Sequence, residues 1–160
     1  MELWSHDKSF GFRLSEKHLL CMLRFCQQSH HVETGGVMMG IYSETRNCAI
    51  VTGIVGPPLD SVHGSSWFIR GVRGLQAHIN HIWRTKHQYY IGEWHFHPCA
   101  ISTASSDDIR QMTEISNSEI YQCPEPLLLI IGGKPPDNYT INVYVFPKDR
   151  RNAVELFESS

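Results

Sequence analysis

The sequence predicts a single α/β domain spanning residues 1–160, with helices on the faces of one mixed, mostly antiparallel sheet. Segments whose apolar residues alternate, as in strands, take turns with segments of helical apolar spacing. A chain of 160 residues also suffices for one buried core, and no repeat or low-complexity linker divides it. The expected order of elements is β-α-β-β-loop-α-β-α-β-β.

The first four elements are expected before the proline pair that begins at Pro57. Apolar residues alternate in "SFGFRLS" (9–15), which predicts a strand, and Ser15 is a suitable N-cap for a helix through about residue 28. Two further strands are expected at 37–42 and 48–56, the second ending at the prolines. This segment therefore contributes one helix and three strands.

A long loop is expected at 57–71, with a short strand around Trp67 and Phe68. Helical spacing of apolar residues then predicts a helix over 72–87. The next strand, "YYIGEWHFH" (89–97), ends before a proline. The middle of the chain therefore joins an irregular loop to a helix and a strand.

The last elements follow a second loop. A helix is expected from Ser105 to about residue 118, followed by a buried strand in "PLLLIIGG" (126–133). The alternating segment "YTINVYVF" (139–146) is expected to pair with it antiparallel, because only "KPPDN" separates them. The tail, 149–158, is expected to form a short helix.

Composition excludes several classes of protein. A net charge of −2 provides no basic surface for nucleic acid. No apolar run approaches the length of about 18 residues that a membrane span needs, and the first residues lack the features of a signal peptide. The five cysteines are odd in number and form no C-x-x-C pair, so we expect reduced thiols. We expect a cytoplasmic protein without nucleic-acid or membrane partners.

The segment "GEWHFHPCAISTASSDD" (92–108) has the spacing of a metal site. Side chains two apart in a strand share a face, so His95 and His97 lie on one face with Cα atoms about 6–7 Å apart. Asp108, in the first turn of the next helix, is well placed to provide a third ligand. Two histidines and a carboxylate leave a coordination position open for water, which is typical of catalytic zinc.

Two further residues are candidates for catalysis. Glu33, where the first helix gives way to "TGG" and a core strand, is the candidate general base that takes a proton from water and delivers it to the leaving amine. Ser105, one helical turn before Asp108, is the candidate donor to the oxyanion of a tetrahedral intermediate.

Alternatives remain for several of these roles. Glu93 shares the face of the two histidines and is a rival base, or a hydrogen-bond acceptor for an imidazole. Asp107 is a rival ligand, although it points about 100° away around the helix. Cys99 is a candidate nucleophile with His97 as its base, but the side chains of residues this close in sequence seldom point toward each other. Histidines two apart and an acidic N-cap are each common without a metal, and their combination is what favours a site.

The whole pattern resembles the JAMM (JAB/MPN) metalloproteases. Glu33 in "ETGGVMMG", "HFHP" at 95–98, Ser105 and Asp108 match the family motif E…H-x-H-P-x6-S-x-x-D at every offset. The resemblance implies an MPN/JAB-type, cytidine-deaminase-like sandwich, Zn2+ held by His95, His97 and Asp108, Glu33 as general acid/base and Ser105 as oxyanion donor. It implies cleavage of peptide or isopeptide bonds after the C-terminus of ubiquitin or a ubiquitin-like protein.

Within the family, the compact domain and "YIGEWHFHP" are similar to bacterial JAB deconjugating peptidases of CBASS antiphage operons, or of Bil-type ubiquitin-like systems. Such proteins act on a ubiquitin-like protein or on the C-terminal tail of a CD-NTase (cGAS-like) and its conjugates, and an activating and conjugating enzyme is encoded beside them. Phe96 departs from the Ser or Thr usual between the histidines. The alternative is a catalytically silent MPN scaffold or ubiquitin-like-binding module.

A substrate tail is expected to lie in a groove that leads to the metal. The irregular segments 57–71 and 98–104 flank the site in this interpretation, and the small residues at 64–66 permit close approach of a backbone. The tail would pair as an added strand with an exposed edge.

Overall fold

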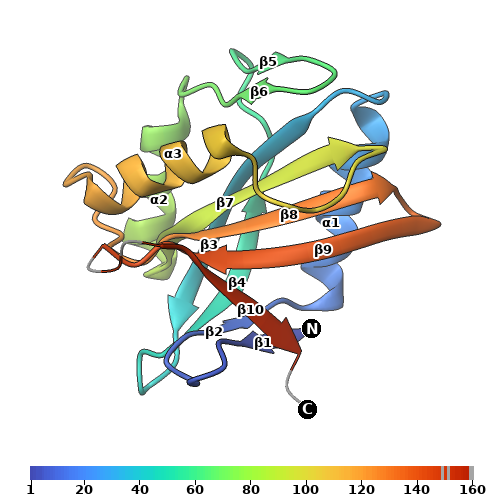
Figure 1. The fold of residues 1–160 in the computed structure, drawn as a ribbon. Coiled ribbons are helices and arrows are strands. Elements are labelled where there is room, and N and C mark those ends of the chain that lie inside the picture. Colours follow the sequence, from blue (N-terminus) through green and yellow to red (C-terminus); the bar gives the residue numbers. More distant parts are fainter. Residues whose placement is uncertain (149, 151, 159–160) are drawn as a thin grey trace.

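The computed structural model describes residues 1–148, 150 and 152–158, which form an α/β fold. Eight strands close into a barrel in the order β1-β10-β9-β8-β7-β3-β4-β2 (Figure 1). All neighbours pair antiparallel except β2 with β4 and β7 with β8, so the mixed, mostly antiparallel sheet is confirmed. The barrel strands are β1 (Glu2–Trp4), β2 (Gly11–Arg13), β3 (Thr34–Tyr42), β4 (Cys48–Val55), β7 (Tyr89–Pro98), β8 (Leu127–Lys134), β9 (Asn138–Val145) and β10 (Val154–Glu158).

Closure of the sheet into a barrel differs from the predicted sandwich of one sheet with helices on its faces. β1 pairs with both β2 and β10, so strands from opposite ends of the chain lie side by side (Figure 1). The sequence assigned no strand to residues 2–4, and the helix predicted over 149–158 is wrong, since its residues 154–158 form β10. Asp149 and Arg151 of that segment lie outside the described residues. A partner distant in sequence decides the state of these short segments, and local spacing does not report it.

The other three predicted helices are confirmed with slightly shorter bounds. They are α1 (Glu16–Gln28), α2 (Leu75–Lys86) and α3 (Ser106–Asn117). The Ser15 side chain accepts a hydrogen bond from the His18 N–H, and Ser105 caps α3 in the same way. None of the helices in the described part of the chain has the length and apolar character needed to cross a membrane.

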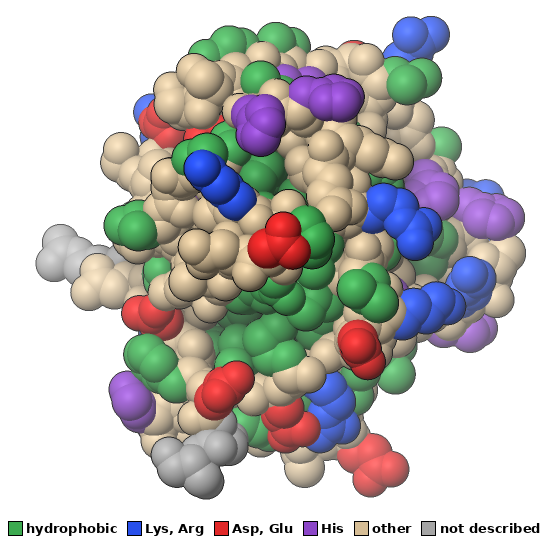
Figure 2. All heavy atoms as spheres, turned by 90° about the vertical axis from the view of Figure 1, so that its right-hand side faces the viewer, with side chains coloured by type: hydrophobic (Ala, Val, Ile, Leu, Met, Phe, Trp, Pro, Cys, Tyr) green, Lys and Arg blue, Asp and Glu red, His purple; other side chains and the backbone are tan. Residues whose placement is uncertain are grey.

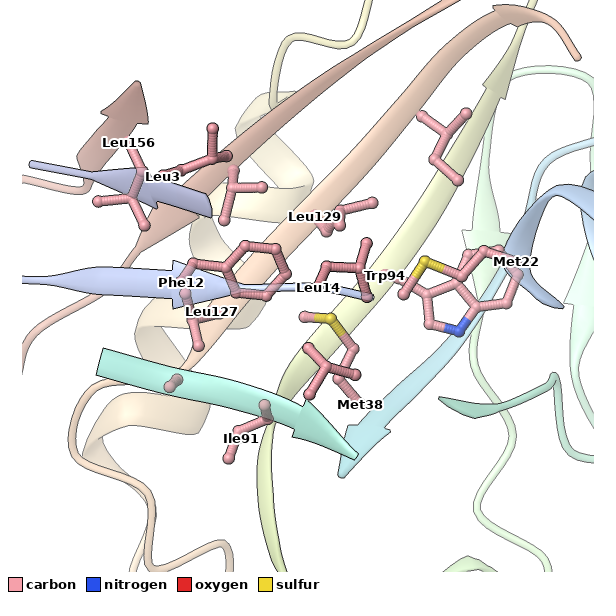
Figure 3. Close-up of a cluster of buried hydrophobic side chains, with 14 of the residues drawn as sticks. Leu3, Phe12, Leu14, Met22, Met38, Ile91, Trp94, Leu127, Leu129 and Leu156 are labelled. Carbon is pink, nitrogen blue, oxygen red and sulfur yellow. The ribbon is translucent and has the colours of Figure 1, made fainter. Parts of the chain in front are cut away.

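Two apolar clusters lie on opposite faces of the sheet. The first joins strand residues such as Phe12 and Leu129 to Met22 of α1 (Figure 3). The second packs Val37 and Leu128 against α2 and α3. Figure 2 shows the molecule from the right-hand side of Figure 1, where hydrophobic side chains remain visible in a hollow among charged ones. Helix α1 therefore packs on one face of the sheet and helices α2 and α3 on the other, although the sheet closes into a barrel.

A bulge in β7 decides which of its side chains faces which cluster. Met38 lies opposite Gly92 but Met39 lies opposite Tyr90, so Ile91 has no partner in the register with β3. Gly92 has φ +148°, and a Cβ there would lie 2.0 Å from the Leu127 carbonyl oxygen. The position therefore requires glycine.

The loop predicted at 57–71 contains a small hairpin, β5 (Val62–His63) and β6 (Phe68–Ile69), which confirms a short strand at Phe68. Asp60 fastens its base by accepting hydrogen bonds from the N–H groups of Val72 and Arg73. The hairpin extends over the region where β7 and the first turn of α3 meet (Figure 1).

Candidate metal centre

The structure brings His95, His97 and Asp108 together. One ligand atom from each lies within 4.8 Å of the others, and all three residues are buried. The histidines come from one face of β7 and the aspartate from the first turn of α3. The strand and the following helix therefore form a three-residue cluster of the kind the sequence predicted.

Asp108 is held as an anion by its neighbours. Its Oδ2 accepts hydrogen bonds from the Ser105 backbone N–H (2.8 Å) and hydroxyl (2.7 Å), and its Oδ1 lies 2.7 Å from His95 Nδ1. Burial raises the pKa of this carboxyl, but the hydrogen bonds from His95 and Ser105 outweigh burial and lower the pKa to about 2. A carboxylate in this state is ready to bind a cation.

The two histidines differ in their surroundings. Burial lowers the pKa of His97, so its imidazole is neutral and able to act as a ligand. Burial also opposes the charge on His95, but Asp108 and Glu93 raise the pKa of His95 to about 9. Within the described residues, His95 Nε2 is the one buried side-chain nitrogen or oxygen without a hydrogen-bond partner.

These observations test whether the cluster suits zinc. Two imidazoles and one carboxylate are the nitrogen and oxygen donors that zinc accepts, and three protein ligands leave a position for water. A buried anion such as the Asp108 carboxylate is costly unless a cation balances its charge. The donor set therefore fits a divalent metal such as zinc.

Glu33 lies immediately before β3 and lines the same cavity as the three cluster residues. Its backbone is held on both sides, because its N–H donates to the Gly64 carbonyl (2.8 Å) and its carbonyl lies 2.8 Å from His63 Nδ1. Half-burial raises the pKa of Glu33, the charge on Asp108 raises it further, and His95 lowers it. A raised pKa makes a carboxylate a stronger base, which suits a group that takes a proton from water.

The cavity that contains these groups measures about 670 Å³. Its walls come from the β5–β6 hairpin, from the loop after β7 and from α3. They combine the polar groups above with exposed apolar side chains, including Trp67, Ile69 and Ile101. A polar floor with apolar walls is the usual composition of a ligand site.

Ser105 contacts the cluster directly. Its Oγ accepts a hydrogen bond from the Asp108 N–H and donates one to Asp108 Oδ2, so the two residues form a capping box. Ser105 also lines the cavity. In this structure its hydroxyl hydrogen serves Asp108, and donation to an oxyanion stays a prediction.

None of the alternative residues belongs to the three-residue cluster, although Asp107 lines the cavity. Glu93 is fully buried behind His95 and does not line the cavity. Asp107 is exposed and pairs with Arg110 at 3.0 Å. Cys99 is also exposed, and its backbone N–H bonds to the Gly133 carbonyl. The geometry therefore favours Asp108 over Asp107 in the cluster, and Glu33 over Glu93 at the cavity.

Sequence reasoning missed three residues around the site. His63 holds the backbone of Glu33, Phe68 meets the His95 ring edge-on with centroids 5.7 Å apart, and Arg70 pairs with Glu93 at 2.8 Å. His63 and Phe68 belong to the hairpin, and Arg70 follows β6 directly. Their spacing carries no local signal, and only the fold of the hairpin over β7 reveals them.

Comparison with known families assigns the part of the chain that contains this candidate site. Residues 15–145 match the family described as prokaryotic homologs of the JAB domain. The chain belongs to this prokaryotic JAB family. The match includes every cluster residue and Glu33, so the family assignment and the site concern the same part of the fold.

Two curated relatives of this JAB chain bear the names of hydrolases. The "CD-NTase/cGAS isopeptidase" of Enterobacter hormaechei subsp. hoffmannii (strain UCI 50) is 41% identical over 127 residues, which cover 79% of this chain and 70% of the relative. The "Probable metalloprotease y4qB" of Sinorhizobium fredii (strain NBRC 101917 / NGR234) is 28% identical over 141 residues, covering 86% and 85%.

A solved structure has the same fold as this JAB chain. The solution structure of protein DSY2949 from Desulfitobacterium hafniense superposes with a TM-score of 0.67 at 20% identity, covering 90% of this chain and 88% of that one. At this identity the similarity concerns the fold alone.

Proposed function

We propose that the protein is a zinc-dependent isopeptidase that cleaves after the C-terminus of a ubiquitin-like protein or a CD-NTase. A bacterial ubiquitin-transfer-like system, encoded nearby, would form these conjugates in antiphage defence. The observation that carries the proposal is the buried cluster of His95, His97 and Asp108, which shares a cavity with Glu33. The 41% identical relative named CD-NTase/cGAS isopeptidase supports this substrate class.

The cluster residues would hold the zinc ion, and Glu33 would move the protons. Zinc bound there supplies a Lewis acid that makes water more acidic and polarises a carbonyl. Glu33 is not in the ligand cluster, and its raised pKa suits both removal of a proton from water and delivery of that proton to the leaving amine. Gly64 and His63 hold the backbone of Glu33 by hydrogen bonds, so the position of its Cα relative to the cluster is defined.

Ser105 would have two tasks. Its hydrogen bonds orient Asp108, which presents the other carboxylate oxygen on the side of His95. On substrate binding the hydroxyl would turn to the developing oxyanion, while the Ser105 backbone N–H continues to hold Asp108. The Ser105 backbone is therefore the fixed part and its hydroxyl the movable part.

The substrate tail would enter between the hairpin and the loop after β7. Exposed apolar side chains from both segments, Trp67 and Ile101 among them, line the cavity. Replacing residues 61–66 by a short flexible link should impair turnover of a conjugate while zinc stays bound. Unchanged kinetics would contradict this role of the hairpin.

The test of the proposal is cleavage of a purified conjugate between a CD-NTase or ubiquitin-like protein and its target. The wild-type chain should cleave it, a zinc chelator should stop the reaction, and added zinc should restore it. Glu33→Ala should bind zinc but not cleave. Glu114→Ala is a matched control, because Glu114 is an exposed carboxylate that lines the same cavity outside the ligand cluster.

Retained cleavage by Glu33→Ala would refute its role as base. Binding of the conjugate without cleavage by the zinc-loaded wild type would instead support the non-catalytic scaffold. A reaction that resists chelation would refute the metal mechanism.

A further inference from the structure

Glu93 is a fully buried carboxylate on the face of β7 that carries His95. Its Oε1 accepts hydrogen bonds from Arg70 Nε (2.9 Å) and the Tyr90 hydroxyl (3.3 Å), and its Oε2 accepts one from Gln111 Nε2 (2.9 Å). Three elements therefore hold one side chain: β7, α3 and the segment after β6. A buried charge fixed this firmly has a defined position relative to its neighbours.

The neighbour of interest is the imidazole of His95. Its Nδ1 contacts Asp108, while its Nε2 lies 3.7 Å from Glu93 Oε2 and has no hydrogen-bond partner. The ring thus stands between two carboxylates, one in the ligand cluster and one outside it. A carboxylate beside the second ring nitrogen of a metal-binding histidine fixes its tautomer and orientation.

Arg70 makes the burial of Glu93 possible. Its side chain is 5% exposed, and its Nη2 lies 2.8 Å from Glu93 Oε1 and 2.8 Å from the Tyr121 hydroxyl. A buried carboxylate without a cation is strongly destabilising, so removal of either residue of the pair should destabilise the fold. Arg70 also follows β6 directly, and therefore joins the hairpin that holds Glu33 to the strand that carries the histidines.

We propose that Glu93 is a positioning residue for His95, and that Arg70 and Gln111 hold it in place to orient the imidazole for metal binding. This inference rests on the proposed function, since it concerns the same site. Glu93 does not line the cavity, so it acts through His95 and contacts no substrate. The Arg70–Glu93 ion pair also fixes the position of the hairpin relative to β7.

The test separates positioning from mere stability. Glu93→Gln alone leaves Arg70 buried without its counter-charge and should lower the melting temperature. The double variant Arg70→Met/Glu93→Gln removes both charges and should recover most of that loss. We would measure the zinc dissociation constant of each folded protein by competition with a chromophoric chelator.

The inference predicts that the double variant binds zinc about 10- to 100-fold more weakly than the wild type, although its fold is restored. Tyr121→Phe is the matched control, since it removes the other side-chain partner of Arg70 and leaves Glu93 in place. It should bind zinc as the wild type does. A double variant with wild-type affinity would overturn the inference, because Glu93 would then serve stability alone.

A second variant decides the matter if the double variant does not fold. Glu93→Asp keeps the charge opposite Arg70 and withdraws the carboxylate from His95, so it should also bind zinc more weakly. Wild-type affinity in folded Glu93→Asp would overturn the inference. Absence of zinc binding by the wild type would overturn the proposed function as well, so the two failures are distinguishable.

Discussion

The two faces of β7 are buried to the same extent by opposite means. Trp94 and Phe96 face the apolar cluster inside the barrel, where they pack against apolar side chains, and the Trp94 indole N–H donates to the Val55 carbonyl oxygen. Glu93, His95 and His97 face the other way, and each is tied to a charged partner. Apolar burial stabilises a fold directly, whereas buried charges are stable only with complete partners. The polar face of this strand carries the candidate metal cluster, and the apolar face stabilises the fold.

The bulge at Gly92 decides which side chains of β7 point to which face, so replacement of Gly92 should have the largest effect. A Cβ at this position meets the Leu127 backbone, and φ is +148°. Gly92→Ala should lower the free energy of unfolding by more than about 4 kcal/mol, with loss of metal binding as the register slips. Urea unfolding and zinc content measure this. Gly53→Ala is the control, since its Cβ would meet only the Met39 Cβ at 3.6 Å; equal effects would contradict the role of the bulge.

Glu33→Gln should change catalysis and leave both faces of β7 intact. Loss of the proton carrier should lower kcat by about 10²- to 10⁴-fold. Zinc content and melting temperature should match the wild type, because Glu33 is half-buried and lies outside the ligand cluster. Loss of zinc in this variant would show that Glu33 is a ligand rather than a base.

Ser105→Ala should have a smaller catalytic effect and a measurable effect on stability. Loss of an oxyanion donor lowers kcat by about 10²- to 10³-fold, and loss of the N-cap of α3 costs about 1 kcal/mol. Kinetics and urea unfolding separate the two effects. Ser15→Ala, at the N-cap of α1, matches the change in capping and should leave kcat unchanged. A wild-type kcat in Ser105→Ala would limit Ser105 to capping.

Phe96→Leu tests the apolar face with the smallest change. Phe96 lies in the barrel cluster and points away from the histidines, so the substitution should lower the free energy of unfolding by about 1 kcal/mol. Zinc content should not change. A loss of zinc comparable to that of a histidine variant would mean that the two faces are not independent.

Much of the site is predictable because it is local. His95 and His97 share a face by the alternation of a strand, and Asp108 lies in the capped first turn of the next helix. The alternation holds from Glu93 onward because the bulge at Gly92 lies before it. Glu33 came from the motif resemblance and from its place before a core strand, and the structure places it in the same cavity.

The rest depends on contacts between distant segments. Closure of the barrel needs Leu3 and Phe157 on neighbouring strands, although the length of the chain separates them. The tail carries only a short strand, in which Val154 and Leu156 turn inward more than Glu158, and this pattern is too brief to exclude a helix. Arg70 reaches Glu93 only after the hairpin folds over β7. No local pattern reports such a pairing.

The most direct test of the account is the zinc content of the wild-type protein, purified without added metal, beside the double variant His95→Ala/His97→Ala. The account predicts about one zinc per chain in the wild type and almost none in the variant, with both proteins folded. No zinc in the wild type, or equal zinc in both proteins, would contradict the site at His95, His97 and Asp108.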